Sequence, residues 1–510
     1  MVAEVASGMV QGVQGEIIKI QADVGNGLPV FHMIGSLSNE VKEARERVRT
    51  ALRNMGTVLP ARRISVNFAP ADLRKYGTFF DLGVAVALLL AMERLPDDRV
   101  KETIFLGELS LDGTLCPISG VLPIILEGEK KGYRRCIVPV ENGEEASFAE
   151  KIEVYVFSSL EEVCDYLKYG EEGESGKIVI SDEKSEQSLL PGTDFSEVHG
   201  QQMAKRALEI AAAGWHNIFL DGPPGVGKSL LASCMPGIMP DMTREEMIEI
   251  TMIYSVKGLL HGGCSLIRER PFRAPSHLVT PAGMFGGGVI PRPGEISLAH
   301  HGVLFLDELP QYKKDLIEMF RLPLEEHAIE LVRKERTVEF PADFLLVTAA
   351  NPCPCGYYPN LKRCHCSDRQ IEKYRNKISG PILDRIDLFV RCDEISYKDF
   401  SNAREEEKSA LKKRRIEAAW QIQKERFHGQ DTAFNSRMSR MQIEKYCRLD
   451  EAGEKLMKEA FDLFRLTGRS YYKVLKVART IADLDHSEQI RSIHLEEALH
   501  FRNIVFISPS

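Results

Sequence analysis

The chain has 510 residues, of which 44% are hydrophobic and 27% charged, and its formal net charge is −8. These are ordinary globular proportions, and the length calls for two to four domains rather than one core. The acidic total argues against a protein that coats nucleic acid over its whole surface. The N-terminus, MVAEVASGMVQGVQG, lacks a basic segment followed by an apolar one, and the apolar run 82–92 is too short to cross a bilayer. We therefore expect neither a secretory signal nor a membrane role.

Eleven cysteines are present, and seven of them stand singly among apolar or mixed neighbours. This usage is typical of small buried side chains in a reducing compartment rather than of a disulfide framework. The sequence therefore predicts a cytoplasmic protein.

Short apolar or alternating segments in the first 170 residues alternate with helical ones, which predicts a mixed α/β domain over 1–170. The expected strands are 17–22, 63–68, 136–139 and 152–157, and the expected helices are 40–55, 82–92 and 126–131. Residues 171–194, EEGESGKIVISDEKSEQSLLPGTD, are rich in Glu, Ser, Gly and Lys. We expect them to form an exposed linker.

Strand and helix segments then alternate over 195–394, and the remainder, 395–510, is expected to be helical. One helix is predicted at 408–427, where the charge run KKRR is expected to be a solvated face. A second is predicted at 472–484, because five apolar side chains fall on one helical face. These are Val474, Val477, Ala478, Ile481 and Leu484.

A glycine-rich motif, G-x-x-x-x-G-K-S, occurs in the segment 216–235, HNIFLDGPPGVGKSLLASCM. Such glycines let backbone N–H groups turn inward around phosphates. We expect Lys228 to reach the β- and γ-phosphates of ATP and the Ser229 hydroxyl to bind Mg²⁺. An apolar strand before the motif and a helix after it weigh against a simple Gly/Pro turn with a surface lysine. The expected nucleotide-binding residues are Gly222, Pro223, Pro224, Gly225, Val226, Gly227, Lys228 and Ser229.

Two further apolar strands end in polar side chains suited to hydrolysis. GVLFLDEL, residues 302–309, ends in two acids, of which Asp307 is expected to bind Mg²⁺ and Glu308 to polarise water. The run 344–350 is followed by Asn351, whose amide can orient the attacking water. By itself such an Asn would be interpreted as a turn former.

The order GPPGVGKS, GVLFLDEL, TAANPCPCG and GPILDRIDL resembles the AAA+ ATPases of the magnesium-chelatase-like clade, and the ComM (YifB) family of bacteria in particular. The likeness covers nearly the whole chain. It implies an AAA+ P-loop α/β core over 195–394 and a helical lid over 395–510. It also implies a ring, usually a hexamer, in which arginines of the next subunit or of the lid complete each ATP site.

Arginines of two segments match positions of that family. Arg385 in GPILDRID matches the arginine finger, and Arg469 in LTGRSYYKVLKVART matches the sensor arginine of the lid, with Arg479 as a second candidate. A finger's charge stabilises the negative charge that develops in phosphoryl transfer. From spacing alone, each would be interpreted as a surface arginine paired with an acid. The catalytic set expected from motifs and resemblance is Glu308, Asn351, Arg385 and Arg469.

The segment 268–302, RERPFRAPSHLVTPAGMFGGGVIPRPGEISLAHHG, is flexible and basic, as suits a loop that contacts a polyanion. A β-hairpin is expected at 329–340, with Arg333, Lys334 and Arg336 in its turn. The residues alone support a phosphate-binding loop and an ordinary surface hairpin about equally. The resemblance, in which such inserts project into the pore, favours DNA binding. The candidate contacts are Arg268, Arg270, Arg273 and Arg292, with Gly286, Gly287 and Gly288 beside them.

The segment 351–368, NPCPCGYYPNLKRCHCSD, places four cysteines within fourteen positions. We expect Cys353, Cys355, Cys364 and Cys366 to bind a structural Zn²⁺ that fixes the long loop, with basic neighbours that favour thiolates. C-x-C pairs are less diagnostic than C-x-x-C pairs. A redox switch and four unligated thiols are therefore the second and third interpretations.

EARERVRTALRNMG, RRISVNFAPADLRKYGTFFDLGVAVALLL and GELSLDGTLCPISGVLPIIL resemble the C-terminal, ribosomal-S5-like α+β domain of Lon protease. A Lon-type site needs a serine nucleophile and a lysine base. Residues 77–81 and 120–123 supply neither, and Ser119 has no lysine at the expected place. We expect this domain to support the ring or to contact DNA or a partner rather than to cut peptides.

The leading hypothesis is an ATP-driven, ring-shaped DNA translocase or helicase that promotes branch migration, as the resemblance implies for natural transformation. The alternative is a protein-remodelling motor of the magnesium-chelatase type, which would require separate chelatase subunits. A third hypothesis, a nucleotide-switched scaffold without turnover, conflicts with the acid Glu308.

Overall fold

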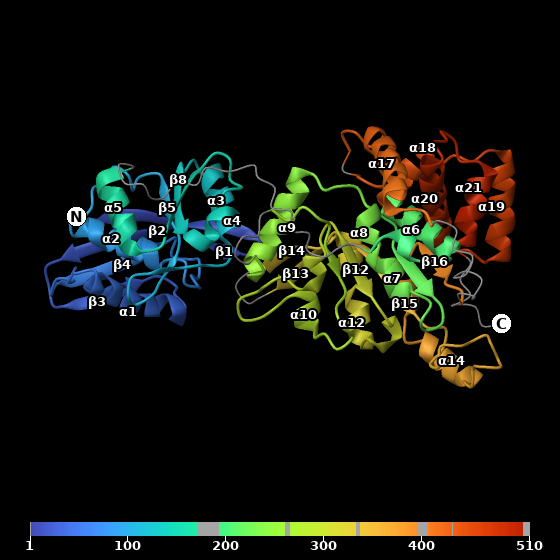
Figure 1. Cartoon of the computed structure of the whole chain (residues 1–510), viewed down its shortest axis with the longest axis horizontal. Helices are drawn as coiled ribbons and strands as arrows, with labels where there is room; N and C mark the ends of the chain where they lie inside the picture. The colour runs from blue at the N-terminus through green and yellow to red at the C-terminus, as the bar shows by residue number, and fades with distance from the viewer. Residues whose placement is uncertain are drawn as a thin grey trace.

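A computed structural model describes residues 2–170, 193–260, 266–332, 337–394, 406–430 and 432–502. The linker expected at 171–194, apart from its last two residues, and the hairpin turn with its three cations lie outside the described residues. An N-terminal mixed sheet, a central parallel sheet and a group of C-terminal helices follow one another along the long axis (Figure 1).

The N-terminal sheet has seven strands in the order β3-β4-β2-β1-β5-β8-β9. Residues of β1 alternate between two buried clusters: Val5 and Met9 belong to one, Ala6 and Val10 to the other. Because side chains alternate along a strand, both faces of this sheet are covered. The four predicted strands correspond to β2, β4, β8 and β9. The bounds are β1 Ala3–Gln11, β2 Gln14–Gly25, β3 Val30–Ile34, β4 Arg63–Ala69, β5 Thr103–Phe105, β8 Arg135–Pro139 and β9 Glu153–Phe157.

The helices of this region include α1 (Asn39–Asn54), α2 (Asp81–Ala91) and α3 (Val121–Lys130). The helix predicted at 126–131 thus begins five residues earlier than expected, because Pro123 is tolerated in a first helical turn. The side chains of α2 are buried from Asp81 to Leu89, as the run 82–92 predicted. Across the described ranges, no helix combines the length and apolar character needed to cross a membrane.

The central sheet has five parallel strands in the order β11-β12-β15-β10-β16. Its three inner strands are almost entirely buried, as in parallel sheets that are covered on both faces. Their carboxyl ends lead into the three motifs predicted to form the ATP site. The bounds are β10 Ile218–Asp221, β11 Phe272–Arg273, β12 Val303–Leu306, β15 Leu345–Ala350 and β16 Leu388–Arg391.

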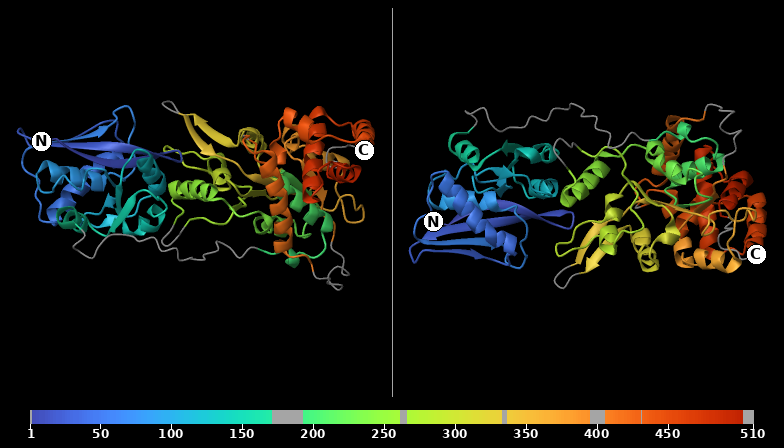
Figure 2. Two further views of the ribbon diagram at one scale, coloured as in Figure 1. Left: turned by 90° about the horizontal axis from the view of Figure 1, so that it is seen from above. Right: turned by 60° about the horizontal axis from the view of Figure 1, so that its bottom comes forward.

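The predicted hairpin is confirmed as β13 (Ala328–Val332) paired antiparallel with β14 (Thr337–Pro341). Figure 2 shows it extending from the parallel sheet toward the N-terminal sheet. There a Cβ added to Gly12 would lie 3.0 Å from a methyl group of Val338. Helix α9 (Arg244–Lys257) makes a second contact between the N-terminal and central regions, because Arg244 forms an ion pair with Glu150 at 2.7 Å.

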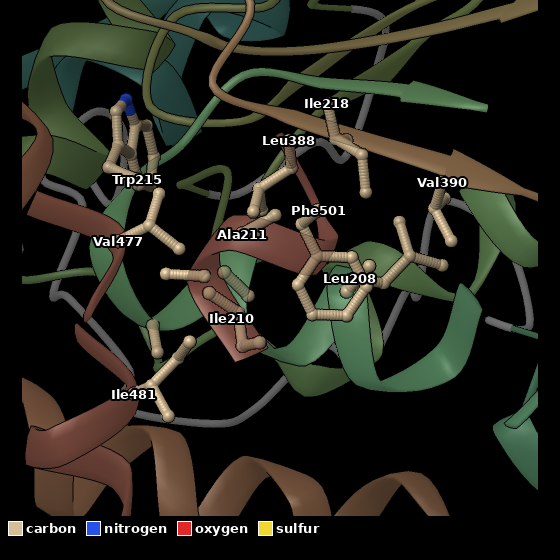
Figure 3. Close-up of a cluster of buried hydrophobic side chains, with 14 of the residues drawn as sticks. Leu208, Ile210, Ala211, Trp215, Ile218, Leu388, Val390, Val477, Ile481 and Phe501 are labelled. Carbon is tan, nitrogen blue, oxygen red and sulfur yellow. The ribbon is translucent and has the colours of Figure 1, made fainter. Parts of the chain in front are cut away.

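The C-terminal region is helical, as predicted. Helix α20 buries all five apolar side chains expected on one face and packs against α6 and α17. Figure 3 shows side chains of α6, β10, β16 and α20 in one buried cluster. The bounds are α6 Gln202–Gly214, α17 Ser409–Arg426, α18 Arg440–Tyr446, α19 Glu451–Leu463, α20 Gly468–Leu484 and α21 Ser492–His500.

The prediction that the charge run 412–415 on α17 is a solvated face is confirmed only in part, because Arg414 is exposed but Lys412 is buried. Arg415 contacts the buried carboxylate of Glu209 on α6 at 2.5 Å, and Lys412 contacts Glu407 at 3.0 Å. The side chain of Glu209 is only 2% exposed, so its charge requires such partners. These ion pairs fix α17 against the central region.

The cluster in Figure 3 gives a test of how firmly α20 is held. Ile481→Ala is expected to lower the free energy of unfolding by about 2–5 kcal/mol, because Ile481 is fully buried. Urea unfolding followed by tryptophan fluorescence measures this, since Trp215 lies in the cluster and Trp420 packs against it. The control Ile493→Ala removes a side chain that is 60% exposed, and it should change stability by less than about 0.5 kcal/mol. Equal effects of the two substitutions would contradict the packing.

Candidate active site

The glycine-rich loop joins the carboxyl end of β10 to α7 (Lys228–Ser233). Gly225 and Gly227 have φ angles of 81° and 85°, in the left-handed region that glycine adopts without steric cost. A Cβ on either would meet nothing within 4 Å, so the loop borders open space. A Cβ on Gly222 would lie 2.5 Å from the carbonyl oxygen of Cys392, which leaves room there only for glycine.

The predicted phosphate-binding lysine is held by three acceptors. The Nζ of Lys228 donates to the carbonyl oxygens of Gly222 at 2.5 Å and Pro223 at 2.9 Å, and to Oδ1 of Asn351 at 3.0 Å. Burial lowers the pKa of Lys228. The structure therefore brings together the lysine and the amide that the sequence predicted to face the γ-phosphate.

The two side chains predicted to bind Mg²⁺ also meet. The Ser229 hydroxyl donates to Oδ2 of Asp307 at 2.7 Å, and Oδ1 of Asp307 accepts the backbone N–H of Glu308 at 2.8 Å. A hydroxyl and a carboxylate are hard oxygen ligands of the kind that Mg²⁺ prefers, so the residues fit this ion. They line a cavity of about 400 Å³ together with Glu308 and Tyr312.

Glu308 has a φ angle of 48°, in the left-handed region, where residues other than glycine are strained. Such a conformation at the end of a strand is typical of sites where it directs a functional side chain. Glu308 lines the same cavity as Ser229 and Asp307, which suits its predicted role with water.

Two neighbours of the site were not predicted from the sequence. Asp221 ends β10, and burial raises its pKa to about 6. Burial likewise raises the pKa of Tyr374 to about 12, while a hydrogen bond from the backbone of Asn351 opposes that shift. Asp221 had a local signal, since it immediately precedes the glycine-rich loop; Tyr374 lies in a polar helix that gave none.

The predicted arginines lie at the other edge of the sheet. Arg385 and Arg469 line a cavity of about 540 Å³ with Asn217 and Asp387, the residues that precede β10 and β16. Because these strands are parallel, the cavity lies at their amino ends, whereas Lys228 lies at their carboxyl ends. The two ends of the strands are about 13–16 Å apart along the strand direction. Within one chain, the structure does not bring the arginines to the glycine-rich loop.

The local contacts of these arginines differ. Arg385 pairs with the Glu325 carboxylate and donates to the carbonyl oxygen of Pro381 at 2.6 Å, whereas Arg469 is exposed. The second sensor candidate, Arg479, is 3% exposed and donates to Asp483 at 3.1 Å inside the helical region. Arg479 therefore has a structural role, and that alternative was wrong.

The candidate DNA contacts are only partly available. Arg270 is 6% exposed and pairs with Glu246 at 3.1 Å, and Arg273 contacts both oxygens of Glu295 at 2.7 and 2.9 Å. The prediction that these two arginines contact phosphates was therefore wrong, because the carboxylates of Glu246 and Glu295 neutralise their charges. Arg268 and Arg292 are exposed, as that role requires.

The four clustered cysteines come together as predicted. Their Sγ atoms all lie within 4.8 Å of one another, and those of Cys353, Cys355 and Cys364 are 3.4, 3.7 and 3.6 Å apart. The edge of a tetrahedron with Zn–S bonds of about 2.3 Å is about 3.8 Å, and a disulfide bond is about 2.05 Å. The thiols thus fit a tetrahedral metal site and form no disulfide. A backbone hydrogen bond from Tyr357 lowers the pKa of Cys355 to about 6.

A second cluster, formed by Glu249, His300 and His301, does not suit a metal ion. Nδ1 of His300 accepts the backbone N–H of Asp343 at 3.0 Å, so Nε2 carries the proton and donates to Glu249 at 3.2 Å. Nε2 therefore has no free lone pair for a metal. These contacts attach α9 to the segment that precedes β12.

Family models described as "Magnesium chelatase, subunit ChlI", "Subunit ChlI of Mg-chelatase" and "Magnesium chelatase, subunit ChlI C-terminal" match residues 194–400, 20–142 and 406–502. Over 497 residues the chain is 39% identical to Competence protein ComM of Haemophilus influenzae, which covers 97% of this chain and 96% of that protein. The chain belongs to the ComM and YifB family. The resemblance predicted from the motifs is thus confirmed, and this magnesium-chelatase-like AAA+ family is one of ATP-binding ATPases.

Other relatives agree with this placement. An uncharacterized protein YifB of Salmonella typhimurium is 39% identical over 97% of this chain and 95% of its own length. Lon protease 2 of Bacillus subtilis is 30% identical over 149 residues, which are 28% of this chain and 26% of that protein. The match to Lon is therefore partial. Ser119 lies against Gly258 at the end of α9, where the N-terminal and central regions are in contact, and the absence of proteolysis stays a prediction.

Glu308→Gln tests the chemistry that this family shares. The substitution keeps the size and removes the charge, so ATP binding should be unchanged while hydrolysis falls about 10²- to 10⁴-fold. Steady-state phosphate release and titration with a fluorescent ATP analogue measure the two effects separately. Lys228→Ala should instead abolish binding, and a Glu308→Gln variant that hydrolyses ATP at the normal rate would contradict the assignment.

Proposed function

We propose that the protein is an ATP-driven, ring-shaped DNA translocase or helicase that promotes branch migration in recombination or natural transformation. The observation that carries the proposal is the division of the site. Lys228, Asn351 and Asp307 lie at one edge of the parallel sheet, and Arg385 and Arg469 lie at the other. The name of the relative, Competence protein ComM, supports the setting.

The divided site favours assembly of several copies. A cationic cavity at one edge can complete the ATP site only if it meets the opposite edge of another copy. A repeated contact between two different surfaces closes into a ring when its rotation allows. We take the hexamer from the family resemblance and place the protein in the cytoplasm. All ten cysteines of the described residues are free thiols, in keeping with a reducing compartment.

Arg385→Ala tests the contribution of the second copy. ATP binding should be nearly unchanged, whereas hydrolysis by the assembled protein should fall about 10³-fold, as for loss of an arginine finger. Phosphate release at rising protein concentration measures the effect, because the contribution of the finger grows with assembly. Arg448→Ala, which removes an exposed arginine of the helical region, is the matched control and should hydrolyse ATP normally. Normal turnover of assembled Arg385→Ala would refute the role.

Cations near the hydrolysis site support DNA as the substrate. Lys314, Arg369, Lys373 and Lys377 line a cavity of about 540 Å³ in which Glu372 is the acid among the lining residues. The three side chains from 369 to 377 are spaced four apart along α14 (Asp368–Arg375) and the residues that follow it. Tyr312 lines both this cavity and the one with Asp307 and Glu308. We assign phosphate binding to this basic cavity, together with the exposed Arg268 and Arg292.

The triple substitution Arg369→Ala, Lys373→Ala and Lys377→Ala tests the basic cavity. Affinity for a single-stranded oligonucleotide should fall, and the slope of log K against log salt should decrease by about 2, because each phosphate contact contributes about 0.7. Fluorescence anisotropy over a salt series measures both quantities. The control Lys455→Ala and Lys458→Ala removes exposed lysines of α19 and should leave the slope unchanged. An unchanged slope in the triple variant would exclude this cavity as the contact.

The alternative, a protein-remodelling motor, is favoured by the family models named after magnesium chelatase. The two functions respond differently to DNA. A translocase should hydrolyse ATP faster with DNA and should exchange strands on a branched substrate in the presence of ATP. Failure of every DNA form to stimulate hydrolysis would contradict our proposal and favour the remodelling motor.

We also infer that Cys353, Cys355, Cys364 and Cys366 bind a structural Zn²⁺. The spacing of their sulfur atoms supports this over the redox and free-thiol interpretations. His365, between two of them, does not belong to the cluster. The metal would close a long loop that directly follows Asn351.

A further inference from the structure

We propose that the metal-held cysteine loop, residues 352–366, is a positioning element of the ATP site, so that loss of the metal weakens nucleotide binding. The proposal rests on the proposed zinc site but not on DNA as the substrate. It concerns the contact of the loop with the glycine-rich loop and its direct covalent connection to Asn351.

The loop has little regular structure of its own to fix its shape. Residues 352–366, all of which are described, contain no helix or strand. Their backbone hydrogen bonds close local turns, as from Gly356 to Cys353 at 3.0 Å and from Cys364 to Asn360 at 2.8 Å. The Cys353 and Cys364 side chains are buried in a small cluster with Ile371. The four cysteines are therefore what can hold the ends of this loop together.

The first contact is with the glycine-rich loop. Gly356 has φ 86°, and a Cβ added to it would lie 2.5 Å from Cδ and 3.1 Å from Cγ of Pro224. These distances place the backbone of the cysteine loop directly against the proline ring. Because a proline ring has almost no freedom to move aside, the position of Gly356 limits where Pro224 can lie.

The second connection is through Asn351, the residue directly before the loop. This residue is two positions before Cys353, and its Oδ1 accepts the hydrogen bond from Lys228 Nζ at 3.0 Å. Cys353 is fully buried, so a metal bound to its sulfur fixes the backbone just after Asn351. On its far side the loop is supported by Arg375, whose guanidinium lies 5.2 Å from the Tyr358 ring centre. One metal site thus controls both Lys228's partner and Pro224.

Gly356→Ala separates the contact from the metal, because it keeps all four thiols. It should retain zinc at the same zinc-to-protein ratio as the wild-type protein, as measured by inductively coupled plasma mass spectrometry. Its dissociation constant for a fluorescent ADP analogue should rise about ten- to hundredfold, which corresponds to about 1.4–2.8 kcal/mol of binding free energy. Cys364→Ser should lose zinc and weaken ADP binding to a similar degree. The control Leu361→Ala, in the same loop and 81% exposed, should change neither quantity.

Two results would overturn the proposal: wild-type ADP affinity in zinc-loaded Gly356→Ala, or unchanged ADP affinity after chelation of zinc from the folded wild-type protein. Circular dichroism shows whether the chelated protein and Cys364→Ser are folded, and Gly356→Ala provides the test if they are not. Failure of the proposed DNA function would give a different result. The wild-type protein would then hydrolyse ATP no faster with DNA, while the ADP affinities of the variants would still differ as expected here.

Discussion

The parallel direction of the central strands is the constraint on which the rest depends. In a parallel sheet all carboxyl ends meet at one edge, where ligands bind. β15 lies between β12 and β10, so the residue after β15, Asn351, is placed between Asp307 and Lys228. The same geometry sends the segment before β16, with Arg385, to the opposite edge. One sheet therefore both assembles the hydrolysis residues and separates them from the arginines.

The helical region is fixed to that second edge by buried polar contacts. Asp387, just before β16, contacts Lys473 of α20 at 2.5 Å and His216 at 3.2 Å, and His216 contacts the Thr480 hydroxyl of α20 at 2.8 Å. Burial strengthens such contacts and makes any unpaired member costly. Because Arg469 is on the same helix, its place relative to Arg385 is set by this network, and a shift of α20 would move the two arginines apart.

Local sequence patterns predicted what depends on neighbouring residues in the chain. The buried apolar face of α20 and the positions of the glycine-rich loop and of the acids after β12 at strand ends agree with the predictions, because each depends on one short segment. The prediction that Arg270 and Arg273 contact DNA was wrong because the acids that pair with them, Glu246 and Glu295, are more than twenty positions away in the sequence. No single segment could predict that the arginines lie at the opposite edge of the sheet from Lys228, because this separation follows from the order and direction of the strands.

Net charge and assembly are connected through the same arrangement. The chain carries −8 overall, so the DNA binding that we propose would depend on the few cations of the basic cavity and on the exposed Arg268 and Arg292. Counterion release scales with the number of phosphates neutralised, and a single copy offers only a handful. Repetition around a ring multiplies these contacts at high effective concentration. Under our proposal, assembly would both complete the ATP site and strengthen DNA binding. ATP hydrolysis and DNA affinity would then increase together with protein concentration.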